Sequence, residues 1–136
     1  MGRNAPMLGE ISRLIKTVLA VVLAAFFLVA GGQGAQAQSE MTWRFQSDYK
    51  YKVQVKFFSS DRKGFVWPGN NRAYNLDDAA AHSIKIACLG GEKICYGGWV
   101  TGNGKLYWGV GADGKQGCEN CCFKCQGQQT PLIHLK

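Results

Sequence analysis

The chain has 136 residues, of which 46% are hydrophobic and 18% are charged, and its formal net charge is +7. Because only about 100 residues follow a leader-like first segment, we expect one domain with a core of modest size and no second domain. The basic residues are scattered among acidic ones instead of forming a block. This spacing excludes the polybasic patch that is typical of nucleic-acid binding, so we predict no nucleic-acid partner.

The first 37 residues have the layout of a secretory signal. A basic segment precedes an uninterrupted apolar stretch at residues 18–30, and Ala-Gln-Ala follows at positions 35–37. We therefore predict a signal helix in residues 1–37, cleaved after Ala37, and an exported protein that is periplasmic or secreted. The apolar stretch is shorter than the roughly 20 residues of a spanning helix, which predicts no stable membrane span after cleavage. The alternative is an uncleaved amino-terminal anchor.

The clearest strand lies at residues 51–57, where apolar and polar residues alternate strictly, as they do when one face of a strand is buried. Residues 59–71 contain glycine, proline and several polar residues, and they predict a long loop that carries Phe65 and Trp67. Residues 75–81 predict one helical turn, because Asn75 can cap it and the alanines favour a helix.

Glycine-rich turns divide the rest of the chain into short apolar segments. Residues 82–88 and 94–100 flank Gly90-Gly91, and a second turn at residues 101–104 precedes residues 106–110, so we expect two successive hairpins. A last short strand is expected at residues 130–135. The predicted fold is all-β: a small hairpin-rich meander or sandwich in residues 38–136, stapled by disulfides.

The six cysteines all lie after residue 87, at Cys88, Cys95, Cys118, Cys121, Cys122 and Cys125. In an oxidising compartment such a cluster predicts three disulfides. The neighbours Cys121 and Cys122 are not expected to bridge each other, because a vicinal disulfide strains its peptide. If the first hairpin places Cys88 opposite Ile94, then Cys88 and Cys95 face opposite ways, each reaches the cluster, and the last two cysteines pair together. A register shifted by one residue weakens this inference.

The duplicated CxxC spacing has a second interpretation. Four thiolates can hold zinc or an iron–sulfur centre, and a CxxC pair can act in redox chemistry. Both require reduced thiols, and the strand that runs into a helix in thioredoxin-like sites is not visible here. We therefore predict disulfides with no metal and no cofactor, and keep a metal-binding or thiol-redox protein as the alternative.

Aromatic residues suggest a binding face. Fourteen of the 16 aromatic residues follow residue 37, and flat rings beside glycines make a surface on which a sugar or a peptide can lie. Trp99 and Trp108 flank the turn that holds Asn103, and Trp67 lies among polar loop residues, so these four residues are the predicted contacts. Trp67 is the first candidate because we expect its ring to be exposed. The alternative is that the aromatic residues form the core.

No catalytic motif surrounds the two histidines, His82 and His134. A pairing of His82 with Asp78 is conceivable, but the adjacent Asp77 and Asp78 are more simply the cap of a turn, since two carboxylates that cleave a glycosidic bond must face a cleft. We therefore expect no enzyme activity. The predicted function is a small exported binding or structural module for an envelope glycan or a protein partner.

Overall fold

The computed structural model describes residues 34–136, and residues Gln36–Lys136 form one compact unit. The predicted signal helix falls mostly on residues 1–33, which lie outside the described part. Within the described residues the fold is all-β, as predicted, and none of them forms a helix. Accordingly, no helix in this part of the chain has the length and hydropathy needed to cross a membrane.

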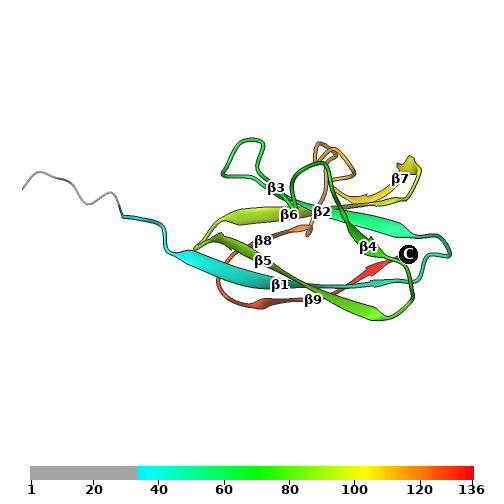
Figure 1. The fold of residues 1–136 in the computed structure, drawn as a ribbon, viewed down its shortest axis with the longest axis horizontal. Helices are drawn as coiled ribbons and strands as arrows, with labels where there is room; N and C mark the ends of the chain where they lie inside the picture. Colours follow the sequence, from blue (N-terminus) through cyan, green and yellow to red (C-terminus); the bar gives the residue numbers. More distant parts are fainter. Residues whose placement is uncertain (1–33) are drawn as a thin grey trace, which may run out of the picture. The chain divides into compact units, whose positions relative to one another are not determined.

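Two sheets form the two layers visible in Figure 1. The three-stranded sheet has the order β5-β1-β9, and its strands are β1 (Gln38–Ser47), β5 (Ala81–Leu89) and β9 (Gln129–Leu135). The six-stranded sheet has the order β3-β2-β6-β7, while β4 pairs with β2 and β8 pairs with β6. Its strands are β2 (Val53–Ser59), β3 (Val66–Trp67), β4 (Tyr74–Leu76), β6 (Lys93–Val100), β7 (Asn103–Gly109) and β8 (Cys122–Lys124).

Alternation along the strands builds the core between the sheets. On β1 every second residue from Met41 to Ser47 is buried, and on β2 Val53, Val55 and Phe57 are fully buried. The rings of Trp43 and Phe57 lie 4.7 Å apart between centroids. The interpretation of the aromatics as core residues therefore holds for these rings.

Several predicted elements are confirmed. The strand expected at residues 51–57 is β2, displaced by two residues. The hairpin around the turn at residues 101–104 is the antiparallel pair β6 and β7, and the expected last strand is β9.

Two predicted elements are wrong. Residues 75–81 form no helical turn: they end β4, pass through bends and enter β5, because Leu76 is drawn into the core as part of a strand. Nor do residues 82–88 and 94–100 form a hairpin. The Gly90-Gly91 turn carries the chain from one sheet to the other, where β5 pairs with β1 and β6 pairs with β2.

All six cysteines form disulfides: as expected, Cys88 and Cys95 each join a cysteine of the cluster, and the last two cysteines pair together. Cys88 joins Cys125, Cys95 joins Cys122, and Cys118 joins Cys121. The Cys88–Cys125 bridge lies in the main core, whereas Cys95 and Cys121 belong to a smaller cluster on the other side of the six-stranded sheet. This pattern was expected from a hairpin that does not form, but it holds because Cys88 and Cys95 do face in different directions.

Candidate functional site

Trp67 is placed differently from the prediction. Its side chain is only 8% exposed, and its Nε1 donates a hydrogen bond of 2.8 Å to the carbonyl oxygen of Ala87 on the opposite sheet. The expectation of an exposed ring is therefore wrong. Polar neighbours suggested a loop, but the short strand β3 pairs with β2 and turns the indole into the core.

Trp99 and Trp108 do not share a face. In the β6–β7 ladder Trp99 lies opposite Tyr107, and Trp108 lies opposite Gly98. Successive side chains of a strand point to opposite faces, so Trp108 points to the core side, where it packs against Tyr49 with 5.5 Å between ring centroids. Its Nε1 donates to the carbonyl oxygen of Lys136. The predicted face of Trp99 and Trp108 is therefore corrected to a face of Trp99 and Tyr107.

The outer face of the six-stranded sheet carries a row of side chains across four strands. Gln54 on β2 lies opposite Asn75 on β4 on one side and opposite Trp99 on β6 on the other. Trp99 in turn lies opposite Tyr107 on β7. Tyr107 is 45% exposed, and Gln54 donates to Asn75 at 3.3 Å. We call this row, together with the outward-pointing Lys56, the Trp99 face. Tyr107 was not among the predicted contacts, although its place in the β6–β7 hairpin was the available signal.

Two open hollows border the Trp99 face on either side of the loop at residues 110–116. The loop can lie against the sheet because Gly97 has no side chain: a Cβ there would overlap the carbonyl oxygen of Gly111. One hollow, of about 400 Å³, is lined by Lys105, Tyr107 and Gln116 among others. The other, of about 470 Å³, is lined by residues that include Lys56, Phe65, Asn70 and Asn71. Both include Ala112 and Asp113 at the tip of the loop.

The predicted polar contact Asn103 lies outside both hollows. It is exposed at the first position of β7, and its Oδ1 accepts a hydrogen bond of 3.2 Å from the backbone N–H of Lys105. Lys105 lines the nearer hollow, so Asn103 fixes the backbone at the edge of the site.

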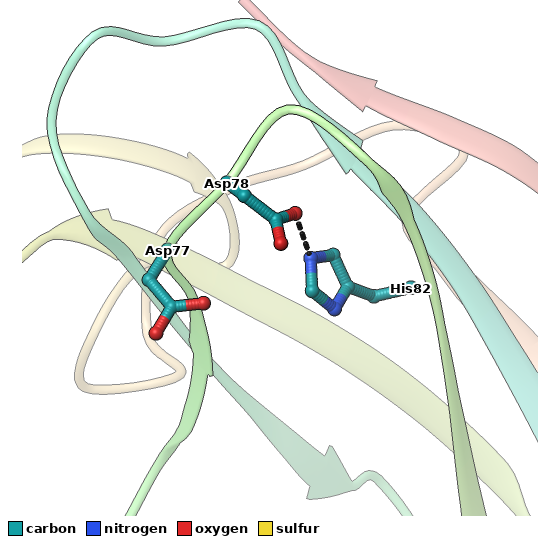
Figure 2. A group of neighbouring side chains, drawn as sticks. All are labelled: Asp77, Asp78 and His82. Carbon is teal, nitrogen blue, oxygen red and sulfur yellow. Dashed lines mark hydrogen bonds and ion pairs between the residues drawn. The ribbon is translucent and has the colours of Figure 1, made fainter.

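A second group of polar side chains lies where β4 turns into β5. Figure 2 shows the Asp78 carboxylate directed at the His82 ring, with Asp77 on the same turn. Asp78 Oδ1 lies 2.7 Å from His82 Nε2 and also accepts from the backbone N–H of Ala80 at 2.9 Å. The hydrogen bonds from Ala80 and then His82 hold the pKa of the Asp78 carboxyl below its ordinary value. The conceivable pairing of His82 with Asp78 is thus present, across a turn and not along a helix.

One potential ligand atom from each of Asp77, Asp78 and His82 lies within 4.8 Å of the other two, which is a spacing that a divalent cation can span. However, both carboxylates are exposed, and the hydrogen bond to Asp78 occupies Nε2. The hydrogen bonds of Asp78 close the turn, which is the capping role that the sequence suggested for this acidic pair.

The cysteine cluster offers no thiolate in this structure, because every sulfur is in a disulfide. Metal binding or thiol chemistry by these residues would therefore require the reduced protein. No family model, no curated protein and no solved structure matches the chain.

Proposed function

We propose that this protein is a small exported, non-catalytic binding module that holds an envelope glycan on its Trp99 face. The observation that carries the proposal is the cross-strand pair of Trp99 and Tyr107 on the outer sheet face. Tyr107 lines one open hollow, and Lys56, next to the Trp99 ring, lines the other. An envelope glycan was one of the two ligand classes expected from the sequence, and the contact residues are now revised.

The chemistry of the face suits a sugar. One face of a sugar ring consists of C–H groups, which pack on an aromatic ring, while its edge carries hydroxyl groups that need hydrogen-bonding partners. Trp99 and Tyr107 offer the rings, and Gln54 and Asn75 place amides in the same row. Asn70, Asn71 and Gln116 add further amides in the hollows. An amide both donates and accepts, as a hydroxyl group requires.

The hollows favour binding over catalysis. Glycoside hydrolysis ordinarily uses two carboxyl groups placed on either side of the scissile bond. The described residues that line the two hollows include a single carboxylate, Asp113. Among the described residues, the only His–carboxylate pair with a short hydrogen bond is His82 with Asp78. Neither residue lines either hollow.

Export is supported by the sulfur chemistry and by the leader-like first segment. Three disulfides in a domain of about 100 residues are compatible with an oxidising compartment, where such bridges persist. The alternative function, a metal or redox protein that uses its thiols, predicts free thiols in protein recovered from its own compartment. Mass spectrometry of the intact, non-reduced protein distinguishes the two, since each disulfide lowers the mass by two hydrogens.

Retention on insoluble envelope polysaccharide tests the proposed function. We expect Tyr107→Ala to weaken retention while the protein stays folded, because the ring is half exposed and its loss removes a stacking surface. Tyr51→Ala is the matched control: Tyr51 is 55% exposed, but it lies in the β1–β2 connection and lines neither hollow. Equal retention of the two variants and the unmodified protein would refute the glycan proposal.

A further inference from the structure

We infer that the glycan held by the Trp99 face is a polysaccharide that bears carboxylate groups. This inference rests on the proposed function and narrows it to one chemical class of ligand. It is carried by the charges of the six-stranded sheet and by the positions of two lysines beside the rings of Trp99 and Tyr107.

The strands of the six-stranded sheet contain no aspartate, and their only charged residues are lysines: Lys56 on β2, Lys93 on β6, Lys105 on β7 and Lys124 on β8. The ladder places Lys93 opposite Lys124, and alternation from the inward-facing Ile94 turns both outward. Glutamate is likewise absent from these strands; Glu92 immediately precedes β6 and is buried. The charged side chains that these strands themselves place on the outer face are therefore all positive.

Two of these lysines lie at the proposed contact rings. Lys56 Nζ is 5.8 Å from the centroid of the Trp99 ring and lines the larger hollow. Lys105 precedes Tyr107 by two residues, so it points to the same face of β7, and it lines the smaller hollow. Among residues 34–136 neither ammonium group forms an ion pair. Their charges are thus free to meet anionic groups on a sugar whose ring stacks beside them.

Among the described residues that line the hollows, Asp113 carries the one opposing charge, and it faces two lysines. It lies at the loop tip that the hollows share, and its Oδ1 accepts a hydrogen bond of 3.0 Å from the backbone N–H of Lys115. A carboxylate in this position can accept hydrogen bonds from sugar hydroxyl groups. The residues that line the two hollows carry a net positive charge, because they include two lysines and one aspartate.

The separation of the lysines favours a polymer over a single sugar. Lys56 is on β2 and Lys105 is on β7, with β6 between them, so their strands are about 10 Å apart at the usual spacing of neighbouring strands. A monosaccharide with one carboxylate can satisfy only one of the two ammonium groups. An extended chain with repeated carboxylates can reach both.

Binding of the mature chain to polygalacturonate and to dextran tests the inference, because both are soluble polysaccharides and only the first carries carboxylates. We expect polygalacturonate to bind more tightly and its affinity to fall as salt rises, since salt screens exposed charges. Lys56→Gln with Lys105→Gln should weaken this binding about three- to tenfold, the effect of losing two exposed charge contacts. Lys50→Gln with Lys85→Gln is the control, because it removes the same charge away from the Trp99 face.

Other binding results would exclude the carboxylate polysaccharide or replace it by another ligand. Equal binding of dextran and polygalacturonate would overturn the carboxylate inference and leave the proposed glycan function standing. An equal loss in the two double variants would also overturn it, because the attraction would then depend on net charge alone. Tighter binding of duplex DNA or of phosphatidylglycerol vesicles, with the same dependence on Lys56 and Lys105, would replace the polysaccharide by another anionic partner. Failure of every polysaccharide to bind would remove the proposed function as well.

Discussion

Arg62 and Glu92 form a bidentate ion pair: Nε donates to Oε1 at 2.6 Å, and Nη2 donates to Oε2 at 2.9 Å. Glu92 is 1% exposed, and the Ser59 hydroxyl and the backbone N–H of Leu89 also donate to its carboxylate. Arg62 in turn lies over the Phe65 ring, 3.6 Å from its centroid. This single carboxylate therefore joins the β2–β3 loop to the turn at which the chain passes from one sheet to the other.

Glu92→Gln should lower the free energy of unfolding by about 2–4 kcal/mol, because it breaks a buried, fully hydrogen-bonded charge pair. Urea denaturation followed by tryptophan fluorescence measures the change. Glu40→Gln is the matched control, since its ion pair with Lys85 is exposed on both sides and should contribute less than about 1 kcal/mol. Similar losses in the two variants would contradict a structural role for the Arg62–Glu92 pair.

The same carboxylate predicts how stability depends on pH. Burial alone raises the pKa of Glu92, but the hydrogen bonds from Arg62, Leu89 and Ser59 together outweigh burial and leave the pKa below the ordinary value of 4.5. Because its pKa is lowered in the folded state, Glu92 makes a contribution to the free energy of unfolding that is fully present above pH 4.5. This contribution is lost as the pH falls through the folded pKa. The free energy of unfolding, measured from pH 7 to pH 2.5, should therefore fall less steeply on the acid side in Glu92→Gln than in the unmodified protein. Parallel curves would show that another group controls the acid transition.

Trp67→Ala should destabilise the protein by about 3–5 kcal/mol, which is the usual cost of removing a buried tryptophan. Trp67→Phe should cost less but still destabilise, because it leaves the Ala87 carbonyl oxygen without its 2.8 Å hydrogen bond. Thermal unfolding compares both variants with Tyr51→Ala, which should be nearly neutral because its ring is exposed. A neutral Trp67→Ala variant would mean that the ring does not belong to the core.

The disulfides should contribute unequally. Cys88–Cys125 closes 37 residues and Cys118–Cys121 closes only three. In the chain-entropy model these loops correspond to about 4 and about 1.6 kcal/mol of stabilisation. We expect denaturation of the two double alanine variants to show the larger loss for Cys88 and Cys125, whose side chains are also buried. Equal losses would contradict an origin in loop closure.

Local patterns in the sequence predicted the strands better than they predicted strand partners. The alternation that identified β2 reflects burial of one face, and the turn at residues 101–104 identified the β6–β7 hairpin. Gly90-Gly91 gave the same local signal, yet there the chain changes sheets. A tight glycine turn allows either outcome, and the choice depends on β1 and β2, which lie far away in the sequence.

The candidate site was only partly predictable for the same reason. Trp99 was identified, but its neighbour Tyr107 depends on the register of β6 and β7, which shifts between Trp99 and Val100. Trp67 was misjudged because its neighbours in sequence are polar, whereas its burial results from contacts with β2 and with Ala87 on the other sheet. The hollows depend on the loop at residues 110–116 lying over Gly97, a tertiary contact without a local signal.

The parallel pairing of β1 with β9 constrains the order in which this protein can assemble. Arg44 on β1 donates a backbone hydrogen bond to the Thr130 hydroxyl, 86 positions later in the chain. One edge of the central strand β1 therefore stays unpaired during folding until β9, the last strand of the chain, has been synthesised and reaches it. Because contacts so distant along the chain form slowly, we expect the pairing of β9 with β1 to complete the three-stranded sheet late in folding.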